Sequence, residues 1–312
     1  MHKSILLFVG LILLVLQHFL ANFSNSVQFV LFLGGIILLG IPHGAADLMV
    51  ATQNKINRKR VFSVSKFFAA YLARLVLSAV IIYFFPLTGI SLFVLLAAYH
   101  FGQTDLEKIP SDHFSKHLFT IAYGLLVLSA ILLHHFDEVK PLYHLFYSGG
   151  NIPFILTFID LNRLYLQVAI LLLFLTSALL YIVFNLSQLR LITGTLWKLM
   201  LLVVIVYNLP MLLGFTFYFI MWHSLSSLSN IIVYLERSGT YTIHEITRQI
   251  VVYSLLAIAG IVLGGFAGYM FIDDKSIIIY TLLGLAVLTT PHMQVMNEMY
   301  VAIASPETPH WG

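Results

Sequence analysis

Long runs of apolar residues, separated by short polar stretches, follow one another along almost the whole chain. Most runs have the ~17–25 residues that an α-helix needs to cross the hydrocarbon core of a bilayer. The pattern therefore predicts an all-α fold, a polytopic transmembrane helix bundle of about 8–10 spans. The ten candidate ranges are 4–20, 27–50, 66–85, 88–105, 117–135, 164–184, 197–212, 215–235, 248–272 and 276–300.

Two segments fit this pattern less well. Residues 197–235 contain Pro210 and Gly214 near their middle, so they form either one kinked helix or two short ones. Residues 151–163 are too short and too polar to span, and we expect them at the membrane interface. No repeat or linker divides the chain, which predicts a single integral-membrane domain over residues 1–312.

Composition supports a membrane protein and removes several function classes. The chain is 60% hydrophobic and 9% charged, whereas a soluble domain has about a quarter of its residues charged. Segment 55–66 carries five basic residues, which predicts a cytoplasmic loop and a multi-pass protein of the cell (inner) membrane. The basic residues lie in such loops, so nothing supports binding of nucleic acid. The sequence has no cysteine, which excludes disulfides, thiolate metal sites and cysteine nucleophiles.

Four histidines lie within or near the ends of the apolar runs: His43, His100, His223 and His292. Hydrocarbon surroundings cost several kcal/mol for a polar side chain that lacks a partner, so the four need an explanation. Along their helices the four lie about 10, 8, 18 and 13 Å from the expected cytoplasmic ends at Val50, Asp105, Leu235 and Val301. We therefore expect the four imidazoles in roughly one layer of the membrane.

Neighbouring polar residues suit a metal site formed by these histidines. Asp47 follows His43 by four residues and could accept its second ring N–H, which would set the tautomer. Gln103 and Asp105 follow His100 and are further candidates to orient a ligand. Neutral imidazoles suit iron, zinc or copper. A proton relay, or core histidines that are each bonded to backbone, remain alternatives at this point.

Four short segments carry a resemblance to a known family. IPHGAAD (41–47), YHFGQTD (99–105), WHS (222–224) and PHM (291–293) resemble the Brp/Blh family of bacterial and archaeal membrane proteins, over about residues 36–300. That family cleaves β-carotene at its central 15,15′ double bond to give two retinal molecules. The resemblance implies a non-haem Fe²⁺ that uses O₂, with His43, His100 and His223 as ligands.

One position departs from the family pattern. The family is expected to have a second histidine four residues after the first in the WHS segment, where this chain has Ser227. Serine is a poor iron ligand, so His292 becomes the candidate for the fourth position. The departure also leaves open a divergent, inactive family member.

The resemblance implies an iron-dependent carotenoid-cleaving dioxygenase, an oxidoreductase of retinal biosynthesis. β-Carotene or a related carotenoid would enter from the lipid bilayer, and a retinal-binding rhodopsin is a candidate acceptor of the product. Aromatic and methionine residues near the histidines are candidates for lining the substrate tunnel: Phe101, Phe219, Met221, Trp222, Met293 and Met296. The rival functions are a histidine-dependent proton- or metal-coupled transporter and a non-catalytic assembly or lipid-binding protein.

Overall fold

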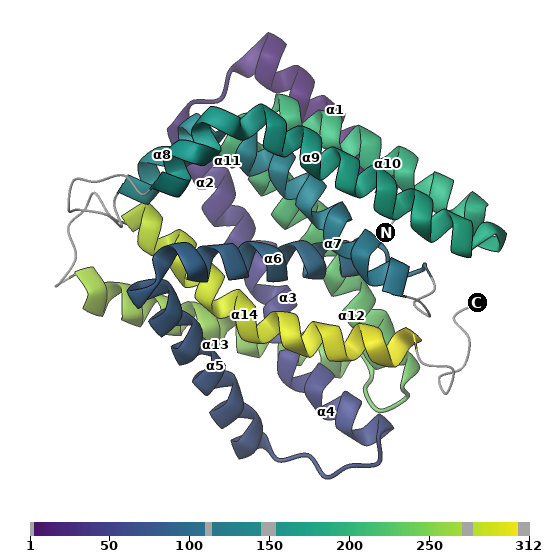
Figure 1. The fold of residues 1–312 in the computed structure, drawn as a ribbon. Coiled ribbons are helices and arrows are strands. Elements are labelled where there is room, and N and C mark those ends of the chain that lie inside the picture. The colour runs from purple at the N-terminus through teal and green to yellow at the C-terminus, as the bar shows by residue number, and fades with distance from the viewer. Residues whose placement is uncertain (1–2, 110–113, 145–153, 270–276, 305–312) are drawn as a thin grey trace. The chain divides into compact units, whose positions relative to one another are not determined.

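The computed structural model describes residues 3–109, 114–144, 154–269 and 277–304, and over these ranges the chain forms helices and no strand (Figure 1). The predicted all-α class is therefore confirmed. Nine helices within these ranges are long and apolar enough to cross a membrane, which makes the chain a multi-pass membrane protein. The nine are Lys3–Leu20, Asn25–Asn57, Val64–Phe84, Pro86–Asp105, Phe114–Leu133, Phe154–Phe184, Leu186–Asn208, Met211–Arg237 and Ile243–Leu263. The tenth predicted range coincides with the helix Ile277–Ala304, which is not one of the nine.

The chain divides into two compact units, each built from two separate stretches of sequence. Unit 1 contains Met1–Gly35 and Ala97–His223, and unit 2 contains Ile36–Leu96 and Ser224–Gly312. Helix α6 (Pro86–Asp105) contributes its first half to unit 2 and its second half to unit 1. The expected single domain over residues 1–312 stays a prediction.

Unit 1 contains four of the nine spans named above in full. Helix α7 packs against α9, α1 against α10, and α2 against α11. Its elements besides the end of α6 are α1 (Lys3–Val15), η1 (Leu16–Ala21), α2 (Asn25–Gly35), α7 (Phe114–Leu128), η3 (Ser129–Leu133), α8 (Phe136–His144), α9 (Phe154–Phe184), η4 (Leu186–Gln188), α10 (Leu189–Asn208), α11 (Met211–Thr216) and η5 (Phe217–Ser224). Of the η elements, η4 is a 3₁₀ turn and the others are π-helical.

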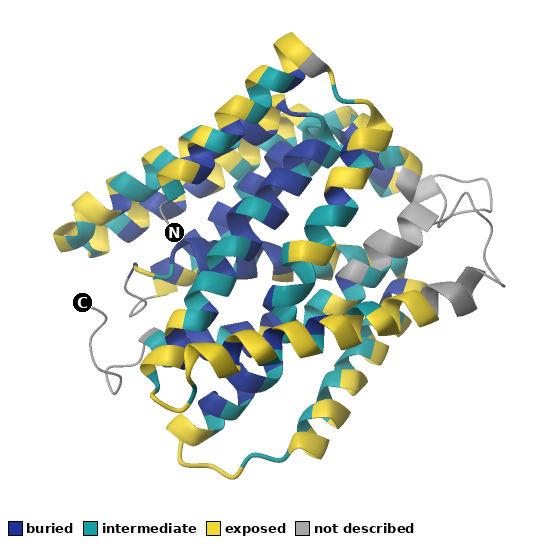
Figure 2. Cartoon of the chain, turned by 180° about the vertical axis from the view of Figure 1, so that it is seen from behind, coloured by how far each residue is buried: buried dark blue, intermediate teal, exposed yellow. Residues whose placement is uncertain are grey.

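Unit 2 has its own apolar core. Helix α14 packs against α4 and α5, and α13 packs against α3 and α12. Buried side chains from α4, α12 and α14, among them Met49, Ile231 and Met299, form this core. Exposed apolar residues cover the outer sides of helices, the surface that lipid would contact (Figure 2). The elements of unit 2 besides the start of α6 are η2 (Ile36–Gly40), α3 (Ile41–Ala45), α4 (Asp47–Asn57), α5 (Val64–Phe84), α12 (Leu225–Arg237), α13 (Ile243–Tyr269) and α14 (Ile277–Ala304).

The second half of α6 lies in backbone contact with α7. A Cβ atom added at Gly102 would lie 2.0 Å from the carbonyl oxygen of Thr120, and one added at Gly124 would lie 1.9 Å from that of Ala98. Each helix thus presents small residues four positions apart, the arrangement that lets membrane helices approach closely. Lys116, one residue before the predicted span 117–135, is buried in α7, and its Nζ donates to the carbonyls of Leu106 and Ile109 at 2.6 and 2.7 Å. These contacts fix the end of α6 that carries His100.

Pro210 separates two helices within residues 197–235, the segment predicted as either one kinked helix or two short ones. Helix α10 ends at Asn208, Leu209 and Pro210 are extended with ψ of 149° each, and α11 begins at Met211. The residue before a proline is disfavoured in the helical region, which explains the break. Of the two alternatives, the structure has two separate helices.

The described part of segment 151–163 is continuous with the next span, and its expected place at the membrane interface stays a prediction. Residues 154–163 are the first turns of α9, a continuous helix of 31 residues. Their polar side chains pair with α8: Lys140 binds Asp160, and Arg163 donates to Asp137 at 2.7 Å. Because α8 supplies oppositely charged partners, the polar residues at the start of α9 can belong to the same helix as the apolar span that follows them.

Three of the helices that carry the predicted metal ligands extend further than the hydropathy pattern predicted. They end at Asn57, Arg237 and Ala304, so His43 and His223 lie about 21 Å from the ends of their helices and His292 about 18 Å. His100 keeps its distance of about 8 Å, because α6 does end at Asp105. The depth estimates based on helix ends were therefore wrong for three histidines.

The contact between α6 and α7 predicts a strong effect of one methyl group. Gly102→Ala should lower the thermal unfolding midpoint in detergent by several degrees, because the added Cβ forces the two backbones apart. Gly194→Ala in α10 is the matched control, since its Cβ meets no atom within 4 Å. An equal midpoint for both variants would contradict the close approach.

Candidate functional site

Two of the predicted ligands meet within unit 2. The rings of His43 on α3 and His292 on α14 lie edge to face, with centroids 4.7 Å apart and an interplanar angle of 88°. Both residues are buried. Residues nearly 250 positions apart in the chain thus bring their imidazoles together in one apolar core.

Asp47 orients this pair, although not as the sequence predicted. Its Oδ1 lies 2.7 Å from Nδ1 of His292, and its Oδ2 accepts the hydroxyl of Tyr71 on α5 at 3.1 Å. We had expected Asp47 to accept from His43, whose Nδ1 instead lies 3.4 Å from the carbonyl oxygen of Leu39. In both histidines an acceptor at Nδ1 favours the proton on that nitrogen and the lone pair on Nε2, the nitrogen that a metal would bind.

The other two predicted ligands meet within unit 1. The rings of His100 on α6 and His223 on η5 lie with centroids 4.8 Å apart at 75°. Phe101 packs against His223 with centroids 4.6 Å apart, and Phe219 stacks on the same imidazole at 6.1 Å. All four side chains are buried, so this pair lies in dry, aromatic surroundings.

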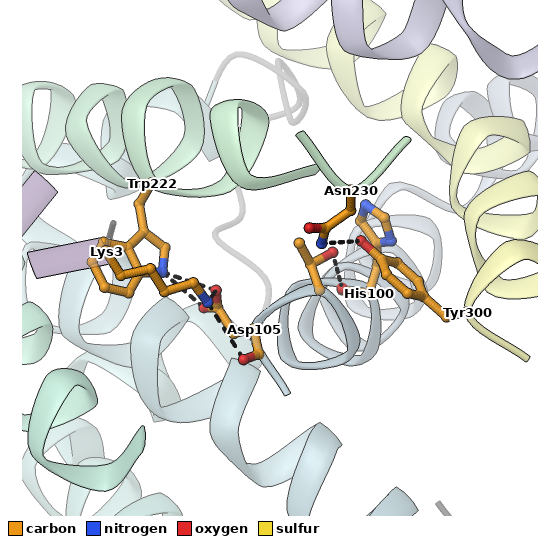
Figure 3. A network of polar contacts seen from close by, with 7 residues as sticks. Lys3, His100, Asp105, Trp222, Asn230 and Tyr300 are labelled. Carbon is orange, nitrogen blue, oxygen red and sulfur yellow. Dashed lines mark hydrogen bonds and ion pairs between the residues drawn. The ribbon is translucent and has the colours of Figure 1, made fainter. Parts of the chain in front are cut away.

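Asp105 is held by a tight polar cluster beside the second pair (Figure 3). The indole Nε1 of Trp222 lies 2.9 Å from each oxygen of its carboxylate, and Nζ of Lys3 lies 2.8 Å from Oδ1. Trp222 directly precedes His223, so Asp105 acts on the neighbour of a predicted ligand. Gln103 is partly buried, and its proposed role toward His100 stays a prediction.

Local π-helix accompanies two of the four histidines. His223 lies within the π-helical η5, and His43 follows the π-helical η2 by three residues. Each π segment interrupts a longer spanning helix, Met211–Arg237 and Asn25–Asn57. Such bulges change the direction in which side chains leave a helix and are frequent at functional sites. Hydropathy carries no signal for them.

Both histidine pairs fit a metal ion geometrically. Two imidazoles that bind one ion at about 2.0–2.1 Å, with an angle between 90° and the tetrahedral value, have ring centres roughly 4.5–5 Å apart. The observed separations of 4.7 and 4.8 Å agree with this range. The described residues contain no group of three or more histidine or acidic side chains that could hold a metal. A metal site with all four histidines as ligands therefore stays a prediction.

Ser227 occupies a buried position in α12. Ser227 is fully buried, and its hydroxyl has no hydrogen-bond partner among the described residues. An orphaned hydroxyl in an apolar core is costly. Within the described part of the chain, Ser227, at the position where the family is expected to have histidine, therefore lacks a hydrogen bond that would compensate the burial of its hydroxyl.

Sequence reasoning missed several contributors to these clusters, among them Tyr71 and Lys3. Tyr71 and Lys3 stand in ordinary apolar helices, and the only signal was a polar atom in a span. Their partners Asp47 and Asp105 are 24 and 102 residues away in the chain. Pairing over such separations depends on helix packing, which hydropathy does not report.

Comparisons with known proteins identify the family of this chain. No solved structure matches the chain. A 114-residue stretch is 27% identical to a protein named beta-carotene 15,15'-dioxygenase from uncultured marine bacterium 66A03, covering 36% of this chain and 41% of that relative. A family model described as beta-carotene 15,15'-dioxygenase matches residues 34–300, a stretch that contains all four histidines. The chain belongs to the beta-carotene 15,15'-dioxygenase family.

Proposed function

We propose that this protein cleaves β-carotene at its central 15,15′ double bond with O₂, giving two molecules of retinal. The proposal includes Fe²⁺ bound by His43, His100, His223 and His292. The observation that supports it best is that the four buried imidazoles form two close pairs, one in each unit, in a chain of this family. A bound Fe²⁺ would supply the activation of O₂ and the redox chemistry.

The chain's own residues have a different task in this proposal. Asp47 keeps the proton of His292 on Nδ1, and Tyr71 holds Asp47 through the other carboxylate oxygen. The backbone carbonyl of Leu39 does the same for His43. Each imidazole thereby presents Nε2 as the candidate ligand atom and has little freedom to rotate.

Buried aromatic and methionine side chains near the histidines favour the proposal of an apolar substrate. Phe101, Phe219 and Trp222 are buried near His223 in unit 1, and Met293 and Met296 are buried near His292 in unit 2. A carotenoid is as apolar as the lipid, so we propose that it enters from the bilayer rather than from water. The same surroundings exclude water from the reacting double bond.

The cell (inner) membrane is the proposed location, because the basic loop at residues 55–66 suits the cytoplasmic side. Retinal is apolar and reactive, so a retinal-binding rhodopsin in the same membrane is the proposed acceptor. Transfer between membrane proteins would spare the product an aqueous passage.

A proton-coupled carrier is the second candidate, and the hydrogen-bonded series Tyr71–Asp47–His292 favours it. Carboxylates and histidines inside spans form proton relays in transporters. Proton flux in proteoliposomes, without consumption of O₂, would support this candidate and contradict the dioxygenase.

Cells that make β-carotene provide the direct test. Expression of the wild-type chain should convert β-carotene to retinal, measured by chromatography of cell extracts. His43→Ala and His100→Ala should each abolish retinal, because each removes a proposed ligand. His244→Ala is the matched control, since His244 is exposed. Retinal production by both ligand variants would rule out the iron site.

Asp47 and Tyr71 should control the affinity for iron. Asp47→Asn should weaken Fe²⁺ binding by about 10–100-fold, the usual effect of losing a carboxylate that orients a ligand. Tyr71→Phe should weaken it less, by about fivefold, since one hydrogen bond to the carboxylate is lost. Titration of the chelator-treated protein with Fe²⁺ measures both, and Tyr83→Phe, 79% exposed on the same helix, is the control. Equal affinity in all three would contradict the role of Asp47.

Histidine at position 227 should restore the family's pattern. Ser227→His should raise the iron content of protein purified from cells with limiting iron, because it adds an imidazole four residues after His223. Ser226→His places the same group one residue earlier and should leave the iron content unchanged. If both variants gain iron equally, the added histidine acts outside the proposed site.

A further inference from the structure

The first helix of the chain reaches the cluster around Asp105. Nζ of Lys3, in the first turn of α1, lies 2.8 Å from Oδ1 of Asp105 and 3.4 Å from its backbone carbonyl oxygen. The carboxylate side chain is 1% exposed, and that of Lys3 is 24% exposed. Residues 3–15 lie outside the stretch 34–300 that the family model matches.

Asp105 depends on this lysine for compensation of its charge. A buried carboxylate without a cation is strongly destabilising, whereas a paired and hydrogen-bonded one is tolerated. Among the described residues, the carboxylate's other hydrogen bonds come from neutral groups: the indole of Trp222 and the hydroxyl of Tyr123. Lys3 also lies over the Trp222 ring, with Nζ 5.3 Å from its centroid, within range of a cation–π interaction.

A second contact holds α1 against the helix of Trp222. A Cβ atom added at Gly10 would lie 2.5 Å from Cζ of Phe217, so only glycine lets this ring lie on α1. Phe217 and Trp222 both belong to the π-helical η5, which also contains His223. α1 therefore contacts η5 at two points: Gly10 packs closely against Phe217, and the ammonium group of Lys3 lies over the Trp222 ring.

We propose that Lys3 is a positioning residue. Through its ion pair with Asp105 it fixes the indole of Trp222, and through that indole the place of His223 in η5. The consequence for His223 as an iron ligand rests on the proposed function, whereas the fixing of Trp222 does not.

Tryptophan fluorescence tests the first step without substrate or iron. The chain has three tryptophans, so Trp197→Phe with Trp311→Phe leaves Trp222 as the sole emitter. In that background Lys3→Met should shift the emission maximum, because the indole loses its cation and a firmly held acceptor. Lys3→Arg keeps the charge and should restore the wild-type emission. Lys66→Met, which changes an exposed lysine, should leave it unchanged.

Comparing the effect of Lys3→Met with and without the Asp105 carboxylate distinguishes the positioning role of Lys3 from a general loss of stability. In the Asp105→Asn background no buried charge needs a partner, so Lys3→Met should cause little further shift. Should Lys3→Met alone fail to accumulate in membranes, Asp105→Asn should restore its accumulation. An unchanged emission in Lys3→Met, or a shift of the same size in both backgrounds, would overturn the proposal, as would failed restoration.

Retinal production provides the second measurement. Lys3→Met should reduce it by roughly tenfold, the effect expected when a residue that orients a ligand is lost, and Lys3→Arg should return it toward the wild type. If the wild-type chain yields no retinal while the emission still depends on Lys3 and Asp105, the positioning of Trp222 stands and the dioxygenase proposal falls. Wild-type retinal yield in Lys3→Met would overturn the effect on His223.

Discussion

Charges inside hydrocarbon must be compensated by other groups of the protein, and two buried carboxylates dominate the arrangement of this chain. Asp47 takes its partners from α5 and α14, and Asp105 from α1 and η5. In each unit one carboxylate thus ties together helices that are distant in sequence. The helices could pack in several registers by apolar contacts alone, but few registers satisfy both oxygens of a buried carboxylate.

The two carboxylates act on the histidines in different ways. Asp47 bonds directly to the ring of His292, so it controls the tautomer and direction of that imidazole. Asp105 bonds to the indole of Trp222, next to His223, so its effect passes through the backbone of η5. Substitution of Asp47 should therefore change the electronic properties of the imidazole of His292, whereas substitution of Asp105 should chiefly change the position of His223.

Sequence patterns predicted the elements well and their pairing less well. The apolar runs predicted all nine helices that could cross a membrane in the described part of the chain. They did so because the bilayer imposes a minimum length on any helix that crosses it. The four histidines could also be singled out, since polar groups in such runs are costly. The partner of Asp47 was predicted wrongly: spacing along one helix favoured His43, but the structure pairs it with His292 of another helix. The spacing of residues along the sequence predicts which side chains are neighbours within one helix, but it does not predict contacts between helices.

Helix ends were the weakest part of the prediction, and the reason is physical. Hydropathy ends a span where polar residues begin, but Gln53, Asn54 and Asn57 continue α4 because Tyr234 of α12 hydrogen bonds to Asn54 and Asn57. The same holds for Asp160 and Arg163 at the start of α9. A polar residue ends a membrane helix only when water is its best partner. Where another helix supplies the partner, the helix extends and the depth of the residues upstream changes with it.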